Sequence, residues 1–280
     1  MCRSVYLRNS RGGGNLELAP QGFSSCQNNN ICYNSDIEHH YKNKKGFTLA
    51  EVLITLGIIG VVAAMTMPSL ITNYQKKQTI SQLKKAYSVI SQALVSSQAE
   101  NGSIEEWNLS NIGQVNHEDP NGSYSETLTS LLNKYFLPYL DIVENCGLYC
   151  AKQKNIKRYE LNRTKEVSWS DKFHYVIALK DGTIIAFMMD NSGSGIFQYV
   201  YINIDINGNS KPNVYGRDIF TFMLTSSTKK LNMAGSGYSR EVLKTSGRRG
   251  CNKNSTYDAG FYCGALIQYD GWEIKDDYPW

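Results

Sequence analysis

The chain has 280 residues, of which 41% are hydrophobic and 19% are charged, and its formal net charge is +4. Six basic and three acidic residues lie in residues 1–46, leaving 23 basic and 22 acidic residues for the rest of the chain. Because the bulk of the chain is nearly neutral, its charge excludes a domain built mainly to bind a polyanion.

Residues 1–46 are polar and rich in Asn, Gly and Ser, with no apolar run, and we expect them to be disordered. This segment is long for a leader. No methionine follows Met1 before Met65, and a start at Met65 would delete most of the apolar run described next. The sequence leaves open whether the leader begins at Met1.

An apolar run follows Lys44, Lys45 and Gly46, and Glu51 is the only ionisable side chain between Phe47 and Ile71. The 20 residues from Val52 to Ile71 carry no charge. At about 1.5 Å of rise per residue they span roughly 30 Å, the thickness of a bilayer core. We therefore expect a membrane helix over 47–71, with the basic leader on the cytoplasmic side.

Glu51 is anomalous within this run. A carboxylate in a membrane segment costs on the order of 3 kcal/mol and normally has a partner and a role. Cleavage of the Gly46–Phe47 bond would create an ammonium on Phe47, close to Glu51 in the same chain or in a neighbouring one. A charge pair in an apolar bundle favours one register, because any register that leaves it unpaired costs several kcal/mol.

The order of Lys-Gly, Phe-Thr-Leu-x-Glu, an apolar helix and Pro68 resembles the class III signal of type IV pilins and type II secretion pseudopilins. The resemblance implies cleavage after Gly46 by a prepilin peptidase, methylation of Phe47 and assembly with other pilin or pseudopilin subunits at an inner-membrane platform. Glu51 would pair with Phe47 of an adjacent subunit. The chain would first cross the bacterial inner membrane once, with its C-terminal domain outside the cytoplasm. It would then enter a filament in the periplasm or at the cell surface.

Other interpretations of the apolar run remain open. Val62-Ala63-Ala64 could serve as the cleavage site of a secretory signal peptide, although the run begins late for one. A simple signal anchor of an extracytoplasmic protein explains the length and the lysines but not Glu51. A minor or tip pilin that binds DNA or a surface ligand is a further alternative.

The helix is expected to continue beyond the membrane over 72–101. Apolar residues recur at three- and four-residue spacings, and Asn101-Gly102 is a stop signal. Pro68 predicts a kink or a locally melted turn near Ala64 to Pro68. The apolar stripe comprises Ile80, Leu83, Tyr87, Ile90 and Leu94.

Residues 102–280 are expected to form one globular domain. A capping box at Ser123 predicts a helix from about Ser125 to Phe136, and four strands are expected at 173–179, 183–189, 197–206 and 219–224. The short turns between them predict an antiparallel meander. The fold class is therefore α+β, a long N-terminal helix packed on a sheet of about four strands, which the pilin resemblance also implies. Residues 225–250 are interpreted as a loop or tail.

Four of the seven cysteines lie beyond the membrane segment, namely Cys146, Cys150, Cys251 and Cys263. Outside the cytoplasm they could form two disulfides. Three pairings are available, of which 146 with 150 and 251 with 263 is the most local. A zinc site made by all four thiolates is the alternative, although the spacings lack a tight CxxC pair.

Asp205, Asn207 and Asn209 have the D-x-N-x-N spacing of a calcium loop, and some pseudopilins use calcium after the sheet. Gly216 stands where the twelfth-position glutamate belongs, and Lys211 adds a positive charge. An Asx-stabilised turn is the competing interpretation. No other cofactor is expected.

Enzymatic motifs are absent from the sequence, and we expect no catalysis. His174 is interpreted as a structural residue of a strand. A basic segment, 229–249, could touch DNA or anionic lipid, but a solvated loop is the simpler interpretation and no nucleic-acid partner is expected. Its members are Lys229, Lys230, Tyr238, Arg240, Lys244, Arg248 and Arg249.

Overall fold

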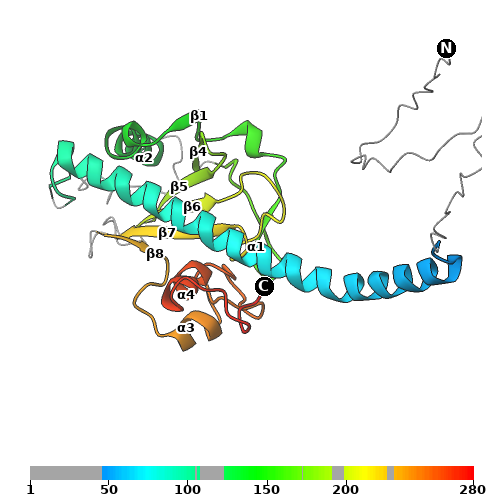
Figure 1. Ribbon diagram of the computed structural model, residues 1–280. Helices are drawn as coiled ribbons and strands as arrows, with labels where there is room; N and C mark the ends of the chain where they lie inside the picture. The colour runs from blue at the N-terminus through cyan, green and yellow to red at the C-terminus, as the bar shows by residue number, and fades with distance from the viewer. Residues whose placement is uncertain (1–45, 105, 108–122, 172, 191–198, 226–229) are drawn as a thin grey trace, which may run out of the picture. The chain divides into compact units, whose positions relative to one another are not determined.

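The computed structural model describes residues 46–280 except 105, 108–122, 172, 191–198 and 226–229. The chain divides within its first helix, α1 (Leu49–Asn101), into one unit that ends at Gly60 and a second that begins at Val61. The described part of the first unit is helical from Leu49 onward. All strands and all other described helices belong to the second unit (Figure 1).

Helix α1 runs without interruption through Pro68, so the expectation of a melted turn there is wrong. Proline removes only one backbone N–H from the ladder. Hydroxyl groups on either side donate to helix carbonyls, Thr66 to Val62 at 3.0 Å and Thr72 to Pro68 at 2.9 Å. The remaining hydrogen bonds of a 53-residue helix therefore carry it past the proline.

The sheet has six antiparallel strands in the order β1-β4-β5-β6-β7-β8, not four. The four expected strands are its centre: β4 (Tyr175–Leu179), β5 (Ile184–Asp190), β6 (Tyr199–Asp205) and β7 (Ile219–Thr225). The edge strands β1 (Ile142–Gly147) and β8 (Leu231–Met233) were missed. β1 has two register shifts against β4, and β8 has three residues, so neither carries a clear alternating pattern.

Helix α1 crosses one face of the sheet in front of its central strands (Figure 1). Its buried residues continue the stripe seen in the sequence, and the Tyr87 ring stacks on Phe222 of β7 at 5.9 Å between centroids. The α+β class, with a long N-terminal helix on an antiparallel sheet, is thus confirmed. The helix residues buried in this core are Leu83, Ala86, Ile90, Ala93 and Leu94.

Shorter elements complete the second unit. The segment interpreted as a loop, 225–250, contains β8 and helix α3, whose start is capped by Ser239 accepting from the Val242 N–H. Disulfides join Cys146 to Cys150 and Cys251 to Cys263, the most local pairing. The other elements are α2 (Ser123–Tyr135), η2 (Leu137–Tyr139), η3 (Ala151–Gln153), β2 (Arg158–Tyr159), β3 (Glu166–Val167), α3 (Arg240–Thr245) and α4 (Cys263–Tyr269).

Candidate processing and assembly site

Gly46 and Phe47 are both exposed, and the Phe47 side chain is 87% accessible. A Cβ placed on Gly46 would meet nothing within 4 Å, and the backbone of this glycine is not in the left-handed region. Nothing in the described chain therefore requires a glycine at 46.

Thr48 and Glu51 form a capping box at the start of α1. The carboxylate Oε2 of Glu51 accepts from the Thr48 N–H at 2.7 Å and from its hydroxyl at 2.9 Å. In return the Glu51 N–H donates to the Thr48 hydroxyl at 3.2 Å. Sequence reasoning missed this role, although Thr-x-x-Glu before an apolar run is the signature of such a box.

The capping box leaves one carboxylate oxygen available. Both contacts from Thr48 go to Oε2, and among the described residues nothing donates to Oε1. Thr48 directly follows Phe47, so Glu51 holds its free oxygen at the end of the helix where a new amino terminus would form.

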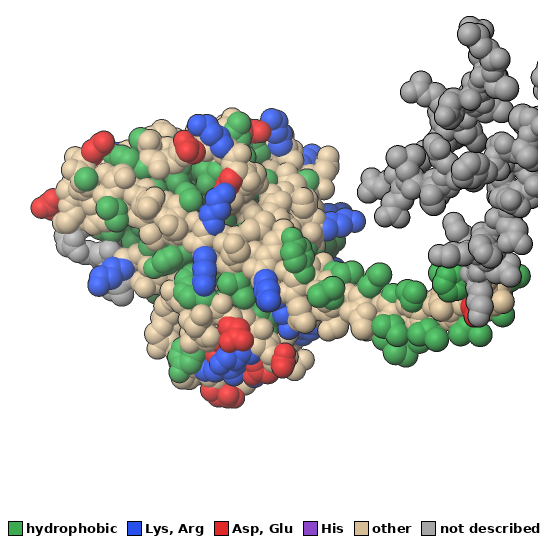
Figure 2. Space-filling view, in the orientation of Figure 1, with side chains coloured by type: hydrophobic (Ala, Val, Ile, Leu, Met, Phe, Trp, Pro, Cys, Tyr) green, Lys and Arg blue, Asp and Glu red, His purple; other side chains and the backbone are tan. Residues whose placement is uncertain are grey.

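The large apolar side chains of α1 up to Ile71 are exposed, as Figure 2 shows for the start of this helix. Among the described residues α1 is the one helix long and apolar enough to cross a membrane, with a mean hydropathy of 2.2 in its most apolar window. The large exposed residues are Leu49, Val52, Leu53, Ile54, Leu56, Ile58, Ile59, Val61, Val62, Met65, Met67, Leu70 and Ile71.

Gly57 and Gly60 lie inside this helix and are not required by the chain itself. A Cβ at either position meets nothing within 4 Å. A glycine inside a helix costs about 1 kcal/mol relative to alanine. These two glycines therefore weaken the helix without avoiding a clash inside the described chain. Small residues of this kind allow another helix to approach closely.

The residues of the expected calcium turn lie against a buried cation. Asp205 ends β6 and is fully buried, with Oδ2 at 3.6 Å from Nη2 of Arg158, which also donates to Asn209 Oδ1 at 2.9 Å. Asn207 lies in the turn that follows β6. The described residues contain no group of three or more His, Cys, Asp or Glu that could hold a metal. Calcium binding here stays a prediction from the spacing.

His174 is buried beside β4, and its Nδ1 lies 2.7 Å from Oδ1 of Asp171. The same carboxylate oxygen accepts the backbone N–H groups of Phe173 and His174. The contact thus closes the turn that leads into β4, which agrees with a structural role.

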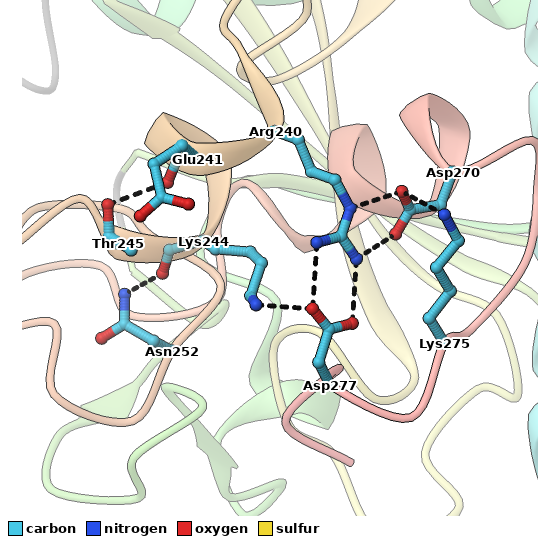
Figure 3. Close-up of polar contacts among 8 residues, drawn as sticks. All are labelled: Arg240, Glu241, Lys244, Thr245, Asn252, Asp270, Lys275 and Asp277. Carbon is cyan, nitrogen blue, oxygen red and sulfur yellow. Dashed lines mark hydrogen bonds and ion pairs between the residues drawn. The ribbon is translucent and has the colours of Figure 1, made fainter.

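Three of the five described cations of the basic segment are bound to carboxylates of their own domain. Figure 3 shows the Arg240 guanidinium between Asp270 and Asp277, at 2.7 and 2.8 Å, with Lys244 2.6 Å from Asp277. Arg249 pairs with Asp258 at 3.3 Å, and Arg248 stacks on Tyr257. Lys229 lies outside the described residues. These contacts leave the segment a poor match for a polyanion, and they tie α3 to the C-terminal segment.

We expect Arg240→Gln to lower the temperature of thermal unfolding of the full chain in detergent. Arg240 holds the pKa values of Asp270 and Asp277 below their ordinary value near 3.8. Carboxyl groups with lowered folded-state pKa values stabilise above that value and lose the effect as pH falls through the folded values. The difference from wild type should therefore shrink in strong acid. Arg248→Gln is the control, because it removes a cation that pairs with no carboxylate among the described residues. An equal loss of stability from Arg248→Gln would contradict this role of Arg240.

Residues 41–67 match the family model of the prokaryotic N-terminal methylation motif, which supports a type IV pilin-like precursor. The motif implies processing by a prepilin peptidase and assembly with other pilin subunits. Residues 69–280 match a second family model, described as a family of unknown function, DUF6613. The chain belongs to this family. The searches of curated proteins and of solved structures found no match to the chain.

Proposed function

We propose that the chain is a structural subunit of a type IV pilus or of a type II secretion pseudopilus, and that it acts by assembly. The observation that carries the proposal is the start of α1. There Glu51, four positions after Phe47, keeps one carboxylate oxygen to which no described residue donates, at the head of a helix whose large apolar side chains are exposed.

The proposed processing reaction is hydrolysis of the Gly46–Phe47 amide. Water supplies the oxygen of a new carboxylate on Gly46, and its protons leave an ammonium on Phe47. Methylation of this nitrogen keeps its positive charge at neutral pH. The capping box then holds Oε2 of Glu51 within its own subunit and leaves Oε1 to accept the ammonium of the next subunit.

The exposed side chains of α1 need a cover before and after assembly. Full burial of one large aliphatic side chain is worth about 1.5–3 kcal/mol, so thirteen in water would oppose a stable soluble state. In the proposed sequence of events lipid covers them first, with the chain crossing the inner membrane once. Neighbouring helices cover them in the filament, where Gly57 and Gly60 permit close approach.

Replacing Gly46 with leucine is expected to abolish processing without changing the fold, because no described contact depends on this glycine. Intact-mass and N-terminal peptide analysis of protein from native membranes would measure it. The wild type should begin with N-methylated Phe47, and the variant should retain the leader. Gly60→Ala, a matched glycine within α1, should be cut normally.

Two outcomes would contradict the proposal. Wild-type protein that keeps Lys44 to Gly46 while the peptidase is active would be a simple signal-anchored protein. A chain that begins near Met65 would indicate ordinary secretion of the C-terminal domain.

A further inference from the structure

A cleft of about 390 Å³ opens in the second unit between α1 and the β6–β7 connection. One wall consists of side chains of α1 shortly after its apolar stretch, and the other consists of the connection together with the last residue of the chain. Its principal lining residues are Gln75, Gln78, Gln82, Lys211, Arg217 and Trp280.

Arg217 is a cation of this cleft that forms no ion pair within the described part of the chain. Its guanidinium lies 4.3 Å from the ring centroid of Trp280, its Nε is buried without a hydrogen bond, and it forms no ion pair with any described residue. The neighbouring carboxylate of Asp218, which also lines the cleft, accepts the backbone N–H groups of Asn213 and Val214, both at 2.7 Å. Partial burial lowers the pKa of Arg217, and the nearby Tyr278 and Asp218 act in the opposite direction without cancelling this effect.

Lys211 adds a second positive charge on the same wall, and its side chain is exposed. The opposite wall offers amide groups from three glutamines and the hydroxyl of Thr79. A planar guanidinium fixed by an aromatic ring, a flexible ammonium and neutral donors form a typical set for a phosphate group.

The near edge of the cleft, at Gln75, lies at the level of the lipid headgroups when the apolar part of α1 occupies a bilayer. Gln75 to Gln82 follow Ile71 by 4 to 11 positions, roughly 6–17 Å along the helix axis. The headgroup layer occupies about 5–8 Å on each side of the hydrocarbon core, so the cleft begins within it. Tyr74, Lys76 and Lys77 stand at the same level, where aromatic and basic side chains anchor helices.

We propose that this cleft binds the phosphate of a phospholipid headgroup, with Arg217 and Lys211 as its cationic ligands. The bound lipid holds the domain against the membrane before the subunit enters a filament. The inference rests on the membrane-anchored state of the proposed function.

The test uses the full chain in vesicles of phosphatidylcholine and phosphatidylglycerol that contain a phosphatidylglycerol analogue with a photoreactive headgroup. Cross-linked peptides are identified by mass spectrometry. We expect cross-links at residues 211–217 and at Trp280, reduced about tenfold by Arg217→Gln, the loss typical of one charge-assisted contact. Lys211→Gln should also reduce them. Because Lys211 is exposed, Lys211→Gln tests the phosphate site even if Arg217→Gln fails to fold.

Lys253→Gln removes an exposed cation that does not line the cleft, and it should cross-link as the wild type does. Equal cross-linking by Lys211→Gln and wild type would overturn the site. So would loss of the cross-links on addition of excess inorganic phosphate, which would indicate a site for free phosphate. Flotation of the vesicles distinguishes the lipid site from the proposed membrane anchorage. A chain that does not float with the vesicles contradicts both. A chain that floats but lacks these cross-links contradicts the lipid site alone.

Discussion

Glu51→Gln is expected to reduce filament incorporation by about a hundredfold or more while cleavage after Gly46 and membrane insertion continue. Glutamine removes the charge and leaves the Phe47 ammonium of the next subunit unpaired in an apolar bundle. An unpaired charge in such surroundings costs several kcal/mol. Sheared filaments and membrane fractions, each quantified by immunoblot, would measure the effect.

The capping box allows charge and helix capping to be separated. Glutamine at 51 still has an oxygen that can accept the Thr48 N–H, so Glu51→Gln keeps the cap and loses the charge. Thr48→Val has the reverse effect, because it removes the capping hydroxyl and keeps the carboxylate, at a cost of about 1 kcal/mol to the helix.

Assembly should therefore follow the charge and not the cap. We expect Thr48→Val to assemble and Glu51→Gln and Glu51→Ala to fail. Glu273→Gln, which neutralises an exposed carboxylate of the domain, should behave as the wild type. Normal filaments from Glu51→Gln together with failure of Thr48→Val would show that Glu51 serves helix capping alone.

Above about pH 8, where Asp205 is ionised in the folded state, Arg158→Met is expected to cost about 3–5 kcal/mol of unfolding free energy, the largest effect on stability that we expect from a single substitution. The Arg158 side chain is fully buried, with its guanidinium 4.0 Å from the ring centroid of Trp169. It lies 3.6 Å from Asp205 and donates to Gln153 at 2.8 Å. Its removal leaves Asp205 buried without its cation.

The double variant Arg158→Met/Asp205→Asn is the matched control. With both charges removed, much of the lost stability should return, because the cost comes from the isolated charge and not from the shape of the side chain. Urea unfolding of the full chain in detergent, followed by tryptophan fluorescence, measures both variants. Equal destabilisation of the single and double variants would instead assign the loss to packing on Trp169.

Burial and the neighbouring Asp218 raise the pKa of Asp205 to about 8. The ordinary value is 3.8, so the folded state favours the neutral acid. The stabilisation by the neutral form is complete below about pH 4 and disappears as pH rises through 8. Relative to Asp205→Asn, the wild type should therefore lose stability between pH 4.5 and 8.5. A constant difference over that range would contradict the raised pKa.

The sequence by itself indicated the cleavage site, the assembly residue and the membrane helix of the proposed function. Gly46, Phe47, Glu51 and the apolar run are contiguous, and the bilayer length and the cost of a buried carboxylate act on contiguous residues. The four central strands were also predictable, because their hydrophobic runs are bounded by turn signals such as Asp181-Gly182. The methylation-motif match confirms the pilin-like class that these residues indicated.

Only the tertiary structure decided which distant residues meet. The edge strands β1 and β8 are too short or irregular to show a strand pattern in the sequence. They depend on β4 and β7 for their hydrogen bonds. Arg158 pairs with Asp205, 47 positions away in the sequence, and Arg240 pairs with Asp277, 37 positions away. Asp205, a residue of the predicted calcium turn, lies beside buried Arg158, and three cations of the basic segment pair with carboxylates of the domain, because burying a charge costs less beside a counterion. The tertiary structure sets which residues supply those counterions.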